Sequence, residues 1–233
     1  MPEATARIEE LIRTAPTPQQ GAHHKRHLGG LRGMEGRFDE GRQLLAEAKQ
    51  ADEDLGLRMA AASIGGHFLG PLELLAGEYQ RAAELMKTSY EEMTSTGDRA
   101  FASTVAAWLA AALLELGRDE EAWQYATIAR ETAAADDVAS QIDGGRVQAR
   151  LLARRGDLPA AEVLGRDVVA MAAATDIPEL HGAALVGLAH VLHASGKRVE
   201  AVEAARAGLE LYERKGVIPS ADRTRALVAE WSA

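Results

Sequence analysis

Apolar and small residues follow one another at helical spacing along almost the whole chain, in segments of about 20 residues that end at turn-forming residues. Residues 27–48, HLGGLRGMEGRFDEGRQLLAEA, are typical, because they read as two helical halves with almost no strand-like alternation. Glycine stands at positions 29, 30, 33 and 36 of this stretch. Each glycine costs about 1 kcal/mol relative to alanine inside a helix, so these glycines need a structural reason.

One glycine returns with a period of about 40 residues. The intervals are 41, 40, 39 and 40 residues, and alanine or glycine stands five residues after each copy. In four of the five copies, a leucine followed by glycine or alanine comes eight and seven residues earlier. Glycine adopts positive φ angles without penalty, so the period predicts five helical hairpins that turn at these glycines. They are Gly36, Gly77, Gly117, Gly156 and Gly196.

Small residues inside the predicted helices let neighbouring helix axes approach closely, which offsets their low helix propensity. This argument accounts for Gly29 and Gly41. It does not account for Gly30 and Gly33.

The pattern predicts an all-α chain. We expect an N-terminal helix at about 3–14 and a last helix at about 220–231, with Ser220 as its N-cap. Leu227 and Trp231 of that last helix should cover the open end of the array, as terminal repeats require. No internal linker appears, so we expect a single superhelical domain over residues 1–233. The predicted hairpins span residues 18–56, 57–97, 98–136, 137–176 and 177–216.

Pro71 falls inside the first helix of the second predicted hairpin. Proline removes a helical hydrogen bond and should bend the helix there. The bend would either open the surface beside His67 or adjust the curvature of the array, and we favour the second.

Composition narrows the class of protein. Hydrophobic residues make up 47% of the chain but aromatic residues only 4%, which favours closely packed helices over sheets. Cysteine is absent, which excludes disulfides and thiolate metal sites. The N-terminus lacks the features of a signal peptide, and no stretch approaches the ~18 apolar residues of a membrane span. We therefore expect a cytoplasmic protein, and the net charge of −9 argues against general nucleic-acid binding.

Motifs for catalysis are missing from the sequence. The glycine-rich stretch does not form G-x-G-x-x-G, and Gly196-Lys197 lacks the remaining residues of a phosphate-binding loop. His23 and His27, and likewise His190 and His193, share a helical face and could supply two metal ligands. No carboxylate stands at ligand spacing, so a polar helix face is the simpler interpretation. We expect no metal, no cofactor and no enzymatic activity.

The phase of the repeat resembles the tetratricopeptide repeat (TPR). A leucine-small pair, a glycine eight residues after the leucine, an alanine five residues later and a small residue twelve residues later carry the resemblance, which covers about 18–216. The tryptophan and the proline of the family pattern are missing, and the period exceeds the family's 34 residues. HEAT-type repeats share the longer period but do not predict this phase. The resemblance implies a right-handed α-solenoid of about five hairpins with a C-terminal capping helix.

The alanine-rich, long form of the repeat is also similar to the C-terminal helical arrays of actinobacterial LuxR-family and cyclase-linked ATP-binding regulators. The ending LELYERKGVIPSADRTRALVAEWSA carries this similarity. It implies that the chain is a fragment of a longer bacterial signalling or transcription regulator.

In TPR arrays the first helix of each hairpin lines a concave groove, and the resemblance carries that role over to this chain. Arg146, Arg150 and Arg154 recur every four residues and form one stripe along a helix, and guanidinium groups suit carboxylates and phosphates. The alternative is a solvated stripe that pairs with acidic residues of neighbouring helices, such as Glu120 or Glu162. The predicted groove residues are His23, Arg26, His67, Arg146, Arg150, Arg154, His190 and His193.

These features favour a non-enzymatic interaction module, a regulatory or scaffold region that binds an acidic protein or peptide segment in its groove. Two alternatives remain open. One is a sensor for a small anionic effector, and the other is a structural or self-associating element that forms a homodimer.

Overall fold

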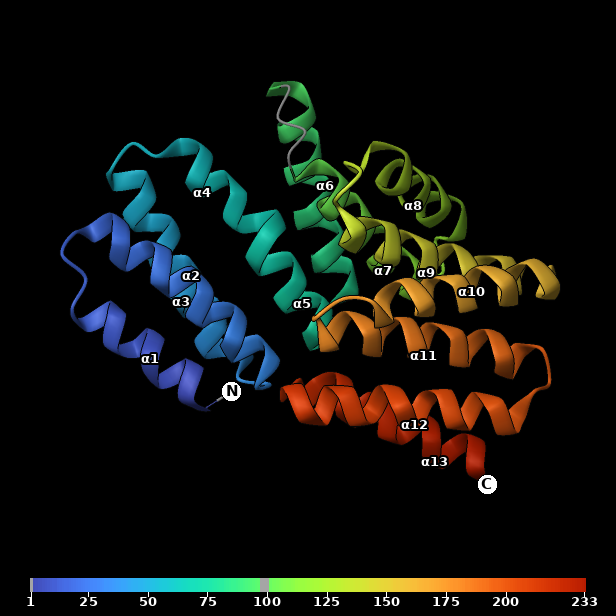
Figure 1. Ribbon diagram of the computed structural model, residues 1–233. Coiled ribbons are helices and arrows are strands. Elements are labelled where there is room, and N and C mark those ends of the chain that lie inside the picture. Colours follow the sequence, from blue (N-terminus) through green and yellow to red (C-terminus); the bar gives the residue numbers. More distant parts are fainter. Residues whose placement is uncertain (1, 97–100) are drawn as a thin grey trace. The chain divides into compact units, whose positions relative to one another are not determined.

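The computed structural model describes residues 2–96 and 101–233, which form helices joined by short turns (Figure 1). The chain divides into two compact units, unit 1 (residues 1–97) and unit 2 (residues 98–233), and each is described by itself. The expectation of one superhelical domain over residues 1–233 therefore stays a prediction. The hairpin boundary predicted at residues 97 and 98 lies outside the described residues.

The helices of the described residues form one preceding helix, five hairpins and one final helix, as expected (Figure 1). Those of unit 1 are α1 (Pro2–Arg13), α2 (Pro18–Met34), α3 (Phe38–Asp54), α4 (Arg58–Ile64), the π-helical turn η1 (Gly65–Leu69), α5 (Gly70–Ala76) and α6 (Tyr79–Thr96). Those of unit 2 are α7 (Ala102–Glu115), α8 (Asp119–Thr132), α9 (Val138–Arg154), α10 (Leu158–Ala173), α11 (Pro178–Ala194), α12 (Arg198–Lys215) and α13 (Ile218–Ser232).

All five hairpins turn at the predicted glycines. Gly36, Gly77, Gly117, Gly156 and Gly196 have φ angles between 71° and 87°. A side chain at such φ angles is strained, so the regular spacing of glycine along the chain reflects the turn conformation.

Close helix packing explains three of the internal glycines of unit 1. A Cβ on Gly29 would lie 2.8 Å from Leu45 Cγ, and a Cβ on Gly41 would lie 2.5 Å from Leu72 Cδ1. A Cβ on Gly33 would lie 3.3 Å from Leu72 Cγ. Gly30 faces open space, so close packing does not explain it.

The first helix of the second hairpin is interrupted just before Pro71. Residues Gly65–Leu69 form the π-helical turn, in which the Gly70 N–H donates to the Gly65 carbonyl oxygen. Helix α5 then starts at Gly70 directly after the π-helical turn, with Pro71 as its second residue. The helix is thus locally distorted beside Pro71 by a π turn, and the expected bend stays a prediction.

In unit 2 the first helices α7, α9 and α11 pack side by side in that order. Each second helix packs against its own first helix and against the helix that follows it. The final helix α13 packs on α12, and its Trp231 enters a core cluster with Leu188, Leu192 and Ala205. Trp231 and Leu227 therefore cover this end, as predicted. The prediction of Ser220 as N-cap is wrong, because α13 begins at Ile218 and Val217 takes the N-cap position.

Candidate binding surface

Five of the eight predicted site residues belong to the surface that α7, α9 and α11 form in unit 2. We call it the first-helix face of unit 2. Helix α9 lies between the other two, and its four-residue spacing aligns the three arginines along one side. The residues in question are Arg146, Arg150 and Arg154 of α9 and His190 and His193 of α11.

Two of the arginines form hydrogen bonds and ion pairs between α9 and the preceding hairpin, α7 and α8. Arg150 Nη1 donates to Glu115 Oε1 on α7 at 2.5 Å. Arg154 Nη1 donates to the Leu114 carbonyl oxygen at 3.0 Å and pairs with Asp119 of α8. Burial would raise the pKa of Glu115, but the adjacent Arg150 guanidinium holds that pKa below its usual value. Both pairs therefore contribute to the packing of successive hairpins.

Arg146 is held differently. Its Nε donates to Asp143 Oδ1 at 2.7 Å on its own helix, and Trp108 Nε1 of α7 donates to Asp143 Oδ2 at 3.2 Å. A Cβ on Gly187 of α11 would lie 3.2 Å from Arg146 Cβ, so glycine there makes room for the arginine. Within the described chain, only the Nε of this guanidinium donates a hydrogen bond. Asp143 and Trp108 thus orient a guanidinium whose two terminal nitrogens donate no hydrogen bond within the described chain, in a side chain that is 17% exposed.

The two histidines support the final helix. The His193 ring stacks on the Trp231 indole, with centroids 4.4 Å apart and planes at 11°. His190 meets the same indole edge-on at 5.1 Å, and Arg198 Nε donates to the Trp231 carbonyl oxygen. Burial, followed by the nearby Arg150 charge, lowers the pKa of His190 to about 4. His190 is therefore neutral at pH 7 and belongs to the surface on which α13 packs.

The acidic partners of the arginine stripe differ from the residues named as the alternative. Glu120 pairs with Arg155 at 3.0 Å, and Glu162 pairs with Arg166 and Lys197. Arg150 and Arg154 do pair with acidic residues of neighbouring helices, as the alternative expected, but the two examples named for it, Glu120 and Glu162, are wrong, because the partners are Glu115 and Asp119. Cross-helix distances select these pairs, which sequence separation alone does not specify.

The other three predicted residues lie in unit 1. His23 of α2 is exposed, and its ring contacts that of His27 at 4.7 Å, which in turn contacts Phe68 of η1. Arg26 points its Nη2 at the fully buried Asp52 of α3, 3.7 Å from Oδ2. His67 is half-buried within η1. Arg26 is thus engaged with the second helix of its own hairpin.

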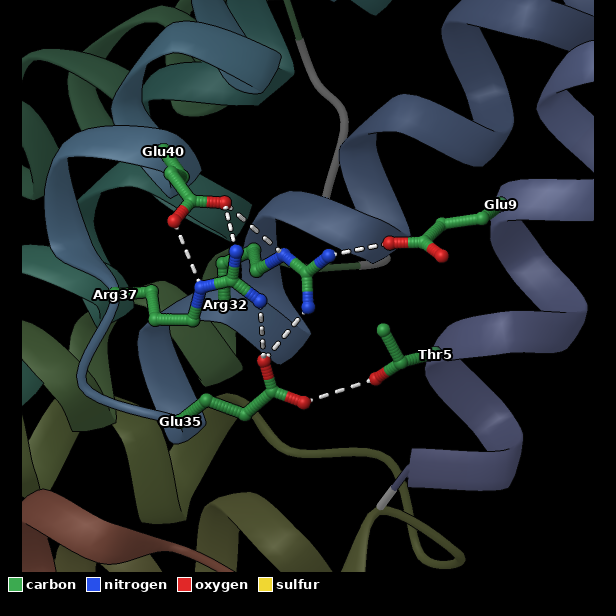
Figure 2. Close-up of polar contacts among 6 residues, drawn as sticks. All are labelled: Thr5, Glu9, Arg32, Glu35, Arg37 and Glu40. Carbon is green, nitrogen blue, oxygen red and sulfur yellow. Dashed lines mark hydrogen bonds and ion pairs between the residues drawn. The ribbon is translucent and has the colours of Figure 1, made fainter.

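A buried polar network in unit 1 was not predicted (Figure 2). Arg32, only 6% exposed, pairs with Glu9 of α1 and with Glu35 at 2.7 Å. Thr5 of α1 donates to the other oxygen of Glu35 at 2.9 Å. Burial would raise the pKa of Glu35, but the hydrogen bonds from Arg32 and Thr5 lower it. This network fastens α1 to the first hairpin.

A second buried charge occupies the corresponding position of the next hairpin. Glu73 is fully buried and pairs with Arg42 of α3 at 2.6 Å and with Arg81 of α6 at 3.2 Å. Both Arg32 and Glu73 stand four residues before a turn glycine, where the other three hairpins carry leucine. A charged residue at a repeat position that otherwise carries leucine was the sequence signal that could have revealed both networks.

Two further searches complete the description of the surface. No group of three or more His, Asp or Glu side chains placed to hold a metal ion occurs in residues 2–96 and 101–233. Across the same described ranges, none of the helices is both long enough and apolar enough to span a bilayer.

The fold is that of TPR-like helical arrays. No protein-family model and no curated protein sequence matches the chain. Among solved structures, BtubC (BKLC) from P. vanneervenii is similar with a TM-score of 0.62 and 20% identity, over 91% of this chain and 90% of that one. A Podospora anserina kinesin light chain-type protein with nearly identical TPR-like repeats gives 0.55 and 19%, over 86% and 98%. These similarities confirm the predicted all-α repeat fold.

A third similar structure is much longer than this chain. It is a signal transduction ATPase with numerous domains (STAND) from Pyrococcus horikoshii, which has a TPR sensor. The TM-score is 0.59 and the identity 16%, over 99% of this chain but only 36% of that protein.

Proposed function

We propose that this chain is a non-catalytic interaction module that binds an acidic protein or peptide segment on the first-helix face of unit 2. The TPR-like fold supports a binding role, because such arrays keep the scaffold and vary the exposed surface of the first helices. No motif for catalysis occurs in the sequence.

Arg146 is the observation that carries the proposal. A guanidinium whose Nε is fixed by Asp143 at 2.7 Å loses little further freedom when it binds a ligand. Its two terminal nitrogens form the fork that suits a carboxylate bidentately. Arg150 and Arg154 lie on the same side of α9, and each already pairs with one acidic group that neutralises its charge. An acidic side chain of a partner is the group that fits this arrangement.

A regulatory role within a longer signalling protein extends this proposal. The whole of this chain is similar in fold to part of a STAND protein that has a TPR sensor. The similarity to the arrays of bacterial ATP-binding regulators, drawn from the sequence, points the same way. A cytoplasmic location, the absence of nucleic-acid binding and a possible homodimer stay predictions.

Selection from a random peptide library tests the proposal. Wild-type chain should enrich peptides with Asp or Glu, and binding should weaken with added salt because screening reduces charge attraction. Arg146→Gln should lose these peptides. Arg166→Gln serves as the matched control, since Arg166 is an ion-paired arginine on the second helix α10. Enrichment that is the same for Arg146→Gln and wild type contradicts the proposal.

A sensor for a small anion is the second candidate, because the oriented guanidinium of Arg146 would also suit a free carboxylate or phosphate. Thermal stabilisation that grows with the concentration of an anionic metabolite, and that Arg146→Gln removes, would favour it. Stabilisation by no anion in such a screen would count against it.

A further inference from the structure

Unit 1 contains a cavity of about 420 Å³ between α3, the α4–η1 segment and α6. Its apolar lining includes Ile64, Leu69 and Leu85. Gly65, the first residue of the π-helical turn, also lines it, and a Cβ placed on Gly65 would meet nothing within 4 Å. The absent side chain of Gly65 is therefore part of the reason that this space is open.

The corresponding place in unit 2 is filled by an arginine. Gly144 stands 12 residues before the turn glycine Gly156, as Gly65 does before Gly77. A Cβ on Gly144 would lie 2.8 Å from Arg130 Cγ and 2.9 Å from the Ala126 carbonyl oxygen, because the Arg130 stem and the backbone of the preceding helix α8 both lie close to this glycine. The glycine therefore makes room for the α8 backbone and for an arginine side chain.

The neighbours of Arg130 have counterparts around the cavity. Arg130 Nη1 donates to Gln148 Oε1, and the Arg130 carbonyl oxygen accepts a hydrogen bond from Gln141 Nε2. Counted from the turn glycines, Arg130, Gln141, Gly144 and Gln148 correspond to Lys49, Ala62, Gly65 and Leu69. All four counterparts line the cavity. The same architectural space therefore holds an arginine in unit 2 and is open in unit 1.

Lys49 does not take the role of Arg130. Its ammonium group lies 3.8 Å from Glu53 Oε1 on the same helix, and its side chain is 55% exposed. The other cation of the lining, Arg81, is paired with the buried Glu73. Helix α6 adds the carboxylates of Glu84 and Glu92 to the lining, where the counterparts in unit 2 are Val163 and Met171. The cavity thus combines an apolar floor with acidic groups on one wall.

We propose that this cavity binds an arginine side chain of a partner protein. The partner's aliphatic stem lies over Gly65 and Leu69, as the stem of Arg130 lies over Gly144. The partner's guanidinium meets the carboxylates of α6, since an arginine buries its stem against apolar surface and keeps its charged end near polar groups. This site belongs to unit 1 and is independent of the acidic segment proposed for unit 2.

Peptide titrations followed by NMR test the site. The probe is acetyl-Ala-Arg-Ala-amide, and the matched controls replace its arginine by lysine or norleucine. The arginine peptide should give saturable shifts of the amides at 61–69 and 81–92, and the lysine peptide should bind more weakly because it lacks the planar fork. Absence of saturable shifts, or equal shifts with norleucine, overturns the proposal.

Three variants locate the binding. Gly65→Leu fills the cavity and should abolish the shifts, whereas Gly30→Leu, another helix glycine with open space around it, should leave them unchanged. Lys49→Arg should place the chain's own arginine in the cavity and compete with the peptide. Glu84→Gln should weaken binding by about fivefold, the effect of one partly exposed ion pair. Binding that survives both Gly65→Leu and Lys49→Arg, with helicity unchanged, overturns the proposal.

Discussion

Four residues before the turn glycine, the two hairpins of unit 1 carry Arg32 and Glu73, whereas the three hairpins of unit 2 carry leucine. Both charged residues are buried, as are Leu113 and Leu192. The fold therefore requires that this position be filled, not that it be apolar. A buried charged residue at this position needs ion-pair partners from several helices, and α1, α3 and α6 supply them in unit 1.

The largest effect should come from exchanging the two residue types, a charged residue and leucine, at this position. Leu113→Glu should lower the free energy of unfolding of unit 2 by more than about 4 kcal/mol, because it buries a carboxylate in a site built for leucine. Glu73→Leu should cost less than about 1 kcal/mol, since its partners Arg42 and Arg81 are 28% and 53% exposed and can regain water.

The positions of the tryptophans allow the two units to be followed separately. The three tryptophans, Trp108, Trp123 and Trp231, all lie in unit 2, so tryptophan fluorescence during urea unfolding reports on that unit. Hydrogen exchange of peptides from residues 2–96 reports on unit 1. If Leu113→Glu and Glu73→Leu lowered the free energy of unfolding of their units equally, the two units would tolerate charge at this position alike.

Removing one partner of the buried carboxylate should come next in size. Arg42→Leu leaves Glu73 fully buried with Arg81 alone and should destabilise unit 1 by about 3 kcal/mol. The double variant Arg42→Leu/Glu73→Leu should recover most of this loss, because it removes the charge that lost its partner. Hydrogen exchange of α2 to α5 provides the measurement, and a double variant as unstable as Arg42→Leu would contradict this account.

The packing of His190 against Trp231 of α13 should make the free energy of unfolding of unit 2 sensitive to acid. The pKa of His190 is about 4 in the folded chain and about 6.5 when exposed, so the unfolded state binds the proton more readily. Its contribution to stability is therefore complete above pH 6.5 and is lost progressively as the pH falls towards 4. Between pH 7 and pH 5 the loss should be about 2 kcal/mol.

His190→Phe keeps a ring against Trp231 and removes the titration. Urea unfolding followed by tryptophan fluorescence should therefore show a smaller difference between pH 7 and pH 5 for this variant than for wild type. His24→Gln in unit 1 should behave as wild type in the same assay. An identical pH dependence for His190→Phe and wild type would exclude His190 as the titrating group.

The smallest effects should differ in sign between the two corresponding glycines. Gly65→Ala should stabilise unit 1 by about 0.5–1 kcal/mol, because alanine favours the helix and its Cβ meets open space. Gly144→Ala should destabilise unit 2 by at least about 1 kcal/mol, because both the Arg130 stem and the α8 backbone at the Ala126 carbonyl oxygen must move. The same exchange and fluorescence measurements apply, and stabilisation by both substitutions would contradict the comparison.

Local chemistry made much of the fold predictable. The five turns follow from glycines that need positive φ, and the hairpins follow from the apolar periodicity between them. Trp231 was correctly expected to cover the end of the array, and its contact with His190 and His193 could have been inferred from that expectation. Ser220 was misjudged because Pro219, which suits the first turn of a helix, allows α13 to begin earlier.

The side-chain partners were less predictable, because they depend on distances across helices. Arg150 finds Glu115, 35 residues earlier in the chain, and Arg42 finds Glu73, 31 residues later. The stripe of arginines on α9 was visible from its spacing alone, but the fixation of Arg146 by Asp143 and Trp108 was not. That Arg130 fills the space over Gly144, while the space over Gly65 is open, likewise depends on side-chain packing and could not be predicted from the sequence.

The affinity of a selected acidic peptide for wild type, Arg146→Gln and Arg166→Gln tests the proposed function most directly. Fluorescence anisotropy titrations should give a Kd at least about tenfold higher for Arg146→Gln, since a hydrogen-bonded charge pair contributes roughly 1.5–3 kcal/mol. Arg166→Gln should bind as wild type does. A Kd for Arg146→Gln equal to that of wild type would contradict the assignment of the first-helix face of unit 2 as the binding surface.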